Sequence, residues 1–276
     1  MERIQAAIQK AKEQREDAGP PAARPAPGPA ARPPGRPAAA AAGTVWGELA
    51  PFLPDPARME RNRVVTFADA DPSHVTFDMM RTKLLRTLKA NGWTSVGITS
   101  PTSGCGKTTV ALNIAFSLAH QADLRTVLVD LDLRRPAVAR ILDLAGGRSV
   151  ARMLQGAATI PETFVRYGDN LAIGANAESM RHSGDLLMSA ATDQAVAGLK
   201  AAFAPDVILY DLPPMLMSDD TMAFLPHLDA VLLVAGAEKS RLDEVDKCEQ
   251  DLAENTQLLG VVLNKCRYMG DDYGYY

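Results

Sequence analysis

Apolar runs alternate with helical patterns along most of this 276-residue chain. Short apolar runs occupy residues 95–100, 125–130, 206–211, 230–235 and 258–264, and a weaker one spans 170–175. Apolar side chains at helical spacing mark residues 77–88, 110–119, 150–154, 193–202 and 241–255. Apolar strands that alternate with helices are typical of a parallel sheet covered on both faces. We therefore predict an α/β domain over residues 75–265, built on a doubly wound, mostly parallel sheet.

The first 74 residues depart from this alternation. Residues 1–16 place Ile4 and Ile8 among charged side chains at helical spacing, which predicts an amphipathic helix, either a docking element or a solvated helix. Residues 17–44 are almost entirely Ala, Pro, Gly and Arg. Such a sequence buries too little apolar surface to order itself, so we predict a disordered linker. Residues 45–74 are expected to form an irregular segment that packs on the domain or leads into it.

Composition and charge argue against several classes of protein. The net charge is −4 and no basic run stands out, so nothing indicates nucleic-acid binding. Cys105, Cys248 and Cys266 lack the spacing of a zinc site or a disulfide framework. No apolar run approaches the roughly 20 residues of a membrane span, and the N-terminus lacks the apolar core of a signal peptide. These features predict a cytoplasmic protein.

A phosphate-binding loop is predicted at residues 100–109, SPTSGCGKTT, between a strand and a helix. Backbone amides at a helix N-terminus bind anions, and Gly104 and Gly106 allow a phosphate to approach closely. Lys107 would reach the β- and γ-phosphates of a nucleotide, and Thr108 would bind Mg²⁺. The usual first glycine of this motif is Pro101 here. The predicted nucleotide-binding residues are Ser103, Gly104, Cys105, Gly106, Lys107, Thr108 and Thr109.

Carboxylates follow two of the predicted strands. Asp130 and Asp132 lie one residue apart at the end of an apolar run, so their side chains share one side of the strand. Two unpaired carboxylates this close would repel each other, and a divalent cation removes that cost, which points to Mg²⁺. Arg134, next in the same register, could pair with a carboxylate or a phosphate. Asp211 ends a third apolar strand, where an aspartate typically holds Mg²⁺ or its water.

The last predicted strand and the C-terminus supply two further candidates. Asn264 could bond the donor and acceptor edges of a purine or serve as an ordinary turn residue, and the sequence leaves both open. Residues 266–276 form a Gly- and Asp-rich segment that we predict to be a flexible tail. This tail holds four of the six tyrosines of the chain, which we interpret as phosphate acceptors: Tyr268, Tyr273, Tyr275 and Tyr276. A docking tail or an incidental aromatic patch are the alternatives.

Taken together, these motifs resemble the bacterial tyrosine autokinases (BY-kinases) of capsule and exopolysaccharide synthesis, over residues 77–276. That family combines a deviant Walker A loop, here 100–109, with a Walker A′ strand of the form DxDxR, here 130–134, and a Walker B strand DxPP, here 211–214. The resemblance implies a deviant Walker A, MinD-like fold and the use of ATP and Mg²⁺. It also implies autophosphorylation of the tail between the subunits of a homo-oligomer.

The resemblance further implies a membrane polysaccharide co-polymerase as the activating partner, which would recruit the chain to the inner face of the membrane, and a phosphotyrosine phosphatase as another partner. One family feature is matched loosely. The family's E-x-x-R-x-x-R oligomerisation helix corresponds to Asp78-Met-Met-Arg81, with Leu84 in place of the second arginine.

The resemblance assigns roles to the catalytic candidates Lys107, Asp130 and Asp132. Lys107 and the loop amides would stabilise the transferring phosphoryl group. Thr108, Asp132 and Asp211 would organise Mg²⁺, directly or through water. Asp130 would orient or deprotonate the incoming tyrosine hydroxyl, and the two Walker A′ aspartates could exchange these roles.

Two alternative functions share the same fold. A partitioning or division-site ATPase of the MinD/ParA type carries a signature lysine early in the loop, where this chain has Thr102, and lacks a tyrosine-rich tail. A non-catalytic regulator, in which ATP binding gates docking to a membrane partner, would use the same nucleotide and Mg²⁺ sites. Detection of phosphotyrosine on the purified chain separates these hypotheses from the kinase.

Overall fold

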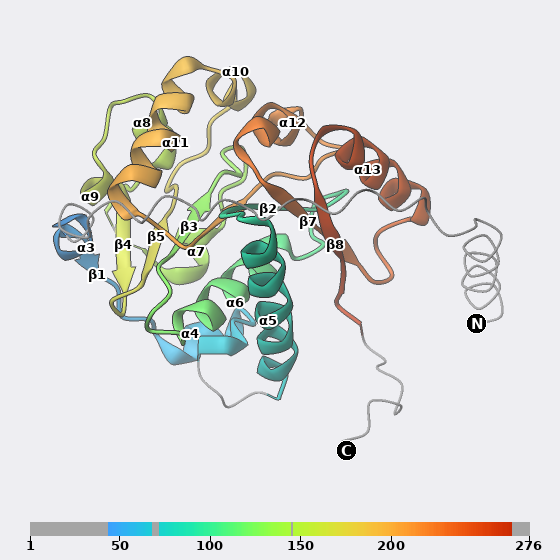
Figure 1. Cartoon of the computed structure of the whole chain (residues 1–276), viewed down its shortest axis with the longest axis horizontal. Coiled ribbons are helices and arrows are strands. Elements are labelled where there is room, and N and C mark those ends of the chain that lie inside the picture. Colours follow the sequence, from blue (N-terminus) through green and yellow to red (C-terminus); the bar gives the residue numbers. More distant parts are fainter. Residues whose placement is uncertain (1–43, 68–71, 145, 267–276) are drawn as a thin grey trace, which may run out of the picture. The chain divides into compact units, whose positions relative to one another are not determined.

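The computed structural model describes residues 44–67, 72–144 and 146–266 (Figure 1). The helix predicted over residues 1–16, nearly all of the predicted linker and the four tail tyrosines therefore lie outside the described residues. These expectations remain predictions.

An eight-stranded sheet forms the centre of the described chain, in the order β1-β4-β5-β3-β6-β2-β7-β8 (Figure 1). Neighbouring strands are parallel except for the antiparallel pair β4 and β5, which confirms the predicted mostly parallel sheet. The strands are β1 (Ala50–Pro51), β2 (Ser95–Thr99), β3 (Thr126–Asp130), β4 (Phe164–Tyr167), β5 (Leu171–Gly174), β6 (Val207–Asp211), β7 (Ala230–Gly236) and β8 (Leu258–Asn264).

Helices cover both faces of this sheet, as the alternating pattern predicts (Figure 1). The four longer helices are α5 (His74–Asn91), α6 (Lys107–Ala119), α11 (Ala190–Phe203) and α13 (Leu242–Asn255). The shorter ones are α3 (Thr44–Glu48), α4 (Pro56–Arg61), α7 (Val138–Leu142), α8 (Val150–Leu154), α9 (Ile160–Thr163), α10 (Ser183–Leu187) and α12 (Asp220–Phe224), with 3-10 turns η1 (Val65–Phe67) and η2 (Leu225–His227).

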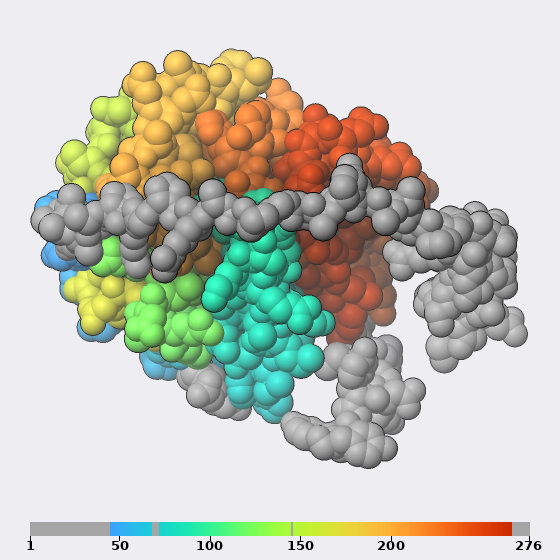
Figure 2. Space-filling model, in the orientation of Figure 1, coloured from blue at the N-terminus to red at the C-terminus, as the bar shows by residue number. Residues whose placement is uncertain are grey.

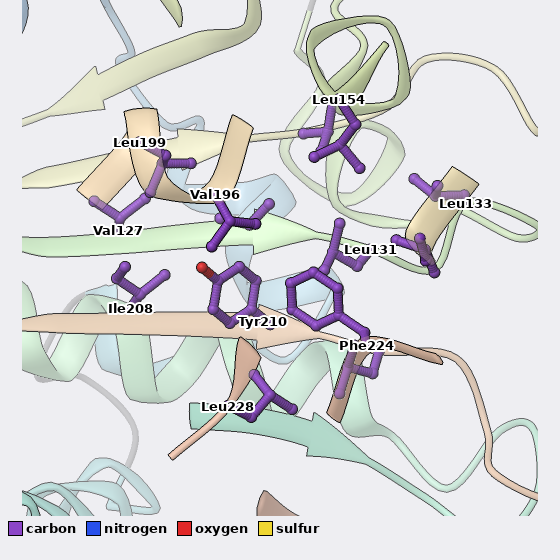
Figure 3. Close-up of a cluster of buried hydrophobic side chains, with 14 of the residues drawn as sticks. Val127, Leu131, Leu133, Leu154, Val196, Leu199, Ile208, Tyr210, Phe224 and Leu228 are labelled. Atoms are coloured by element: carbon purple, nitrogen blue, oxygen red, sulfur yellow. The ribbon is translucent and has the colours of Figure 1, made fainter. Parts of the chain in front are cut away.

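Successive residues of the central strands supply two separate hydrophobic cores. Val127 and Ile208 pack with the helices on one face of the sheet, whereas their neighbours Leu128 and Leu209 pack with α6 on the other. This division follows from the two-residue period of a strand. Figure 3 shows the first core, where the ring of Tyr210 packs against Phe224 with 4.9 Å between centroids. The same alternation decides which strand residues face α6 and the phosphate loop.

The segment before the predicted domain contributes to its core. The sequence predicts an irregular segment over residues 45–74, but the structure forms α3, β1, α4 and η1 there, and β1 extends the sheet beside β4. Trp46 is buried, donates a hydrogen bond from Nε1 to the carbonyl of Phe203 over 3.2 Å and packs edge-on against that ring. Asn113 of α6 accepts bonds from the amides of Val65 and Thr66 over 2.7 and 3.1 Å.

Helix α5 carries the residues that loosely match the family's oligomerisation motif. Arg81 donates to Asp78 and to the carbonyl of Ser117 in α6, each over 2.8 Å. Leu84, which replaces the second arginine, is buried between the helix and the sheet. Both motif residues are therefore engaged within this chain. Among the described residues, no helix is long and apolar enough to cross a membrane.

Candidate active site

The phosphate loop joins β2 to α6 at the carboxyl edge of the sheet, where parallel sheets place their ligands. Gly104 and Gly106 have φ angles of 78° and 93°, which side chains other than glycine adopt at a cost. Gly106 also immediately precedes the first residue of α6, so the loop amides open onto a helix N-terminus. The backbone therefore has the form of an anion-binding loop.

Lys107 lies in the floor of the site and is 8% exposed. Its ammonium group is 2.9 Å from Asp132 Oδ2 and 3.2 Å from Asp211 Oδ1. Burial by itself lowers the pKa of Lys107, but the carboxylates of Asp211 and Asp132 outweigh it and hold the pKa above its usual value. The lysine is thus charged and is shared between two carboxylates. A nucleotide phosphate would have to compete with them for this charge.

Asp211 is bonded on both oxygens at the end of β6. Thr108 Oγ1 donates to Asp211 Oδ2 over 2.6 Å, while Lys107 contacts the other oxygen. Asp211 pairs with Asp130 across β3 and β6, so two buried carboxylates lie side by side. Burial raises the pKa of Asp211, although Lys107 and Thr108 oppose this shift.

Asp130 is fully buried and holds the loop that follows its own strand. One carboxylate oxygen accepts from the amide of Asp132 over 3.2 Å, and the other accepts from Ala137 and Val138 over 3.2 and 3.1 Å. Burial, reinforced by Asp211, raises the pKa of Asp130 to about 8. Of the two Walker A′ aspartates, Asp132 lines the cleft that opens above the site, whereas Asp130 has a pKa close to neutrality.

A cleft of about 410 Å³ opens above these residues. Its walls come from the phosphate loop, the loop after β3 and the Pro213–Pro214 turn after β6: Ser103, Gly104, Gly106, Lys107, Thr108, Thr109, Asp132, Arg134, Arg135, Ala137, Arg140, Ile141, Pro213, Pro214, Met217 and Ser218. Arginines on one wall face a floor that holds a shared lysine. This distribution of charge suits a polyanion.

Arg134 is anchored by a carboxylate. Its guanidinium donates to both oxygens of buried Asp220, over 3.2 and 3.1 Å, and to Ser183 over 3.1 Å. Ser183 also donates to Asp220. Of the two partners that the sequence left open for Arg134, the structure supplies the carboxylate. The side chain remains 40% exposed along the cleft.

Asn264 holds the phosphate loop from the last strand. Its side-chain amide donates to the carbonyl of Cys105 over 2.9 Å, and a β-carbon on Gly106 would lie 2.2 Å from the same nitrogen. The Cys105 side chain is buried and points to the turn after β7, with Sγ 3.3 Å from Ser240 Oγ. In the described structure, Asn264 thus positions the loop, a role beyond the two that the sequence suggested.

The oxygen ligands of the site fit Mg²⁺ that is bound together with a nucleotide. Thr108, Asp132 and Asp211 supply a hydroxyl and two carboxylates, the hard ligands that Mg²⁺ prefers. No three His, Cys, Asp or Glu side chains in the described ranges form a group that could hold a metal. Mg²⁺ in phosphate-transfer sites normally keeps several waters and takes its remaining ligands from the phosphates.

The structure brings together the nucleotide, metal and catalytic residues suggested by the sequence. The tail tyrosines lie outside the described residues. Sequence reasoning missed the residues after β7, Lys239 and Ser240, which lie against the loop. It also missed Arg135 and Arg140 in the cleft wall. Lys239 and Ser240 could have been predicted from the sequence, because polar residues that follow a buried parallel strand lie at the ligand edge of the sheet.

Comparison with known proteins defines the class of the chain. Residues 96–270 match the family model of the CobQ/CobB/MinD/ParA nucleotide binding domain. The match begins in β2, includes the phosphate loop and all three carboxylates, and covers more than half of the chain. The chain therefore belongs to this family of nucleotide-binding domains.

The chain is similar to individual proteins of bacterial tyrosine phosphorylation and exopolysaccharide synthesis. The tyrosine-protein kinase YwqD of Bacillus subtilis (strain 168) is 26% identical over 223 residues, which are 80% of this chain and 93% of YwqD. The succinoglycan biosynthesis transport protein ExoP of Rhizobium meliloti (strain 1021) is 32% identical over 176 residues, 62% of this chain but 22% of ExoP. The crystal structure of the VpsO kinase domain superposes with a TM-score of 0.62 at 28% identity and covers 70% of this chain and 96% of that domain.

These comparisons confirm the predicted fold and the resemblance to bacterial tyrosine kinases. The chain spans nearly all of YwqD and about a fifth of the length of ExoP. Its similarity thus extends both to a kinase of comparable size and to one part of a much longer transport protein.

Proposed function

We propose that this chain is an ATP-dependent protein-tyrosine kinase that phosphorylates the tyrosines of its own C-terminal segment, in a system that makes and exports exopolysaccharide. The proposal rests on the cluster of Lys107, Asp132 and Asp211 beneath the phosphate loop. That loop has Thr102 at the position where MinD/ParA-type ATPases carry their signature lysine. Similarity to YwqD and to the VpsO kinase domain supports it.

In the proposed reaction, a tyrosine oxygen attacks the γ-phosphorus of ATP, and the bond from that phosphorus to ADP breaks. Lys107 and the amides of the phosphate loop stabilise the charge on the transferring group. For this, Lys107 must exchange part of its contact with Asp132 and Asp211 for phosphate oxygens. Thr108, Asp132 and Asp211 would hold Mg²⁺, which neutralises phosphate charge when bound.

The Asp130–Asp132 pair accepts the proton of the tyrosine hydroxyl in this proposal. Asp132 lines the cleft and can meet a substrate, while Asp130 has the raised pKa that suits a general base near neutral pH. The amide of Asp132 donates to the Asp130 carboxylate, so the two residues are linked directly.

Phosphotyrosine formation tests the activity. We expect the purified chain to gain phosphotyrosine with Mg²⁺ and ATP, and mass spectrometry to locate it at Tyr268, Tyr273, Tyr275 or Tyr276. Lys107→Met should abolish the signal, while the exposed Lys247→Met keeps it. Hydrolysis of ATP without phosphotyrosine would favour a MinD/ParA-type switch. Nucleotide binding with neither reaction would favour the non-catalytic regulator.

Transfer between the subunits of a homo-oligomer is part of the proposal. A groove of about 330 Å³ lies between α5 and β8, lined by Met79, Met80, Leu84 and Val261 among others. On the face shown in Figure 2, α5 and the C-terminal elements lie next to each other at the surface. Met79 and Leu263 are 58% and 62% exposed. Exposed apolar side chains that gather beside a groove are typical of a protein–protein interface.

Oligomerisation can be tested apart from catalysis. Light scattering after size-exclusion chromatography should show Met79→Glu and Leu263→Glu shifted toward monomer, with Leu53→Glu as the matched exposed control. If the oligomer carries the reaction, mixing a Lys107→Met chain with a wild-type chain should label the tail of the inactive one. Labelling confined to the wild-type chain would contradict transfer between subunits.

A membrane polysaccharide co-polymerase is the proposed activator and would recruit the chain to the inner face of the membrane. The similarity to one part of ExoP, a transport protein of succinoglycan biosynthesis, supports a link to such a system. Residues 1–16 are the candidate docking element. Deleting them should abolish co-fractionation with membranes but leave nucleotide binding unchanged. A phosphotyrosine phosphatase would reverse the tail reaction.

A further inference from the structure

Lys239 lies against the phosphate loop, although it belongs to none of the nucleotide-binding motifs. It occupies the turn between β7 and α13, far from the loop in sequence. A β-carbon placed on Gly104 would lie 2.7 Å from the Lys239 ammonium nitrogen and 3.2 Å from its Cε. The charged end of the side chain therefore reaches the middle of the loop whose amides face the cleft.

The turn that carries Lys239 is attached to the same loop. Ser240 Oγ is 3.3 Å from Cys105 Sγ and accepts a bond from the amide of Gly236 over 3.0 Å. Gly236 itself approaches so closely that a β-carbon there would lie 3.3 Å from Cys105 Cα. The amide of Lys239 donates to the Gly236 carbonyl over 3.1 Å. These contacts set the position of the Lys239 backbone relative to the loop before any nucleotide binds.

The surroundings of the Lys239 ammonium differ from those of the Lys107 ammonium. Lys107 is shared between two carboxylates. Lys239 is exposed, and within the described ranges no hydrogen bond or ion pair reaches its ammonium group. A lysine beside a row of amide donors, with no carboxylate to neutralise it, adds to the positive potential of the loop. An anion bound beside the loop would interact favourably with both the lysine and the amides.

We propose that Lys239 binds the phosphates of the nucleoside triphosphate as a second cation, from the β7–α13 turn of the same subunit. The signature lysine of the MinD/ParA-type ATPases lies within the phosphate loop, and this chain has Thr102 at that position. Lys239 supplies a comparable charge from a different element. The inference rests on the proposed function only in taking the ligand to be ATP.

Nucleotide affinity tests this role without requiring kinase activity. Titration calorimetry with a non-hydrolysable ATP analogue and Mg²⁺ should show Lys239→Met weakened by at least about 10-fold, the loss expected for a charge-assisted hydrogen bond. Binding of adenosine, which has no phosphate, should be unchanged. Lys239→Arg should retain most of the affinity. Lys247→Met, an exposed lysine on α13, is the matched control and should bind as the wild type does.

The salt dependence provides a second readout. Because one phosphate contact is lost, the affinity of Lys239→Met should fall less steeply with salt concentration than that of the wild type. If Lys239→Met and Lys239→Gln both bind the analogue within about 2-fold of the Lys247→Met control, the role of Lys239 is wrong, whatever the kinase assay shows. If Lys239→Met binds weakly while the wild type forms no phosphotyrosine, the inference stands and the kinase proposal fails.

Discussion

The side-chain amide of Asn264 donates a hydrogen bond to the carbonyl of Cys105 over 2.9 Å, and so joins the end of β8 to the phosphate loop. The two residues are 159 positions apart in the chain. The bond places the last strand of the sheet in direct control of the loop conformation. It also separates two roles for Asn264, holding the loop and recognising a purine, which respond differently to substitution.

Substitution of Asn264 should weaken nucleotide binding without changing base preference. Asn264→Ala and Asn264→Asp both lack the donor, so each should lose about 1 kcal/mol of binding free energy, or about 5-fold in affinity for ATP. The ratio of the ATP and GTP dissociation constants should remain that of the wild type, as measured by calorimetry. A collapse of that ratio would show that Asn264 recognises the base instead.

Lys107→Met should destabilise the nucleotide-free chain as well as inactivate it. The change leaves Asp132 and Asp211 buried without their cation, and breaking a buried ion pair costs about 3 kcal/mol or more. Urea unfolding at pH 8 should show this loss. At pH 5 the loss should shrink, because burial raises the pKa of Asp211 and its carboxyl can take up a proton once Lys107 no longer opposes this shift. Equal losses at both pH values would contradict the ion-pair explanation.

The pKa of Asp130 predicts a pH-dependent stability. A folded carboxyl with a pKa of about 8 keeps a proton that the unfolded chain releases near pH 4, so its contribution favours folding at low pH and is lost as the pH rises through 8. Asp130→Asn cannot titrate. The stability of the wild type relative to this variant should therefore fall between pH 5 and 8, by at most about 1.4 kcal/mol per pH unit.

The prediction concerns how the difference in unfolding free energy between wild type and Asp130→Asn changes with pH. It therefore does not depend on how much the substitution destabilises the chain at any one pH. Urea unfolding across the pH range measures it. Asp219→Asn is a suitable control for the substitution itself, because the Asp219 side chain is 77% exposed. A flat profile for Asp130→Asn would show that the Asp130 carboxyl titrates normally.

Tyr210→Phe should be neutral or stabilising. Tyr210 lies in the core that Figure 3 shows. It is 1% exposed, and its hydroxyl has no hydrogen-bond partner among the described residues. The ring contact with Phe224 survives the change. Removing a buried hydroxyl that is unpaired recovers its desolvation cost, so the free energy of unfolding should rise by up to about 1 kcal/mol. Thermal and urea unfolding measure this, with Phe224→Leu as a destabilising comparison in the same core.

The sequence predicts the central strands well because they are apolar along their whole length. It fails at the sheet edge, where β1 has two residues and β4 has four. Such short strands are formed by pairing with a neighbour and leave little pattern of their own. The same reason explains why the segment around Trp46 looked irregular. Its order comes from contacts with Phe203, a residue distant in the chain.

The candidate site shows a similar division. Motifs place Lys107, Thr108 and Asp211 at the ligand edge, because Lys107 and Thr108 come after the loop that follows β2 and Asp211 is the last residue of β6. The functions of Asp130 and Lys239 are set by contacts that no local pattern contains. Asp130 bonds to backbone amides seven and eight residues away, and Lys239 reaches the loop through the packing of a separate turn. Spacing along a chain specifies which edge a residue occupies, but not its neighbours there.

Asp130 pairs with Asp211 across β3 and β6, so the nucleotide site forms only when these two strands pair in the native register. A slip of one residue between these strands would turn one carboxylate to the opposite face and scatter the groups around Lys107. A misfolded chain would then have no site for ATP. Because a ligand that binds the native state alone stabilises it in proportion to its concentration, the ATP of the cell would act as a quality control on this protein. Chains with a correctly registered sheet would be protected, and the others would be left to proteolysis.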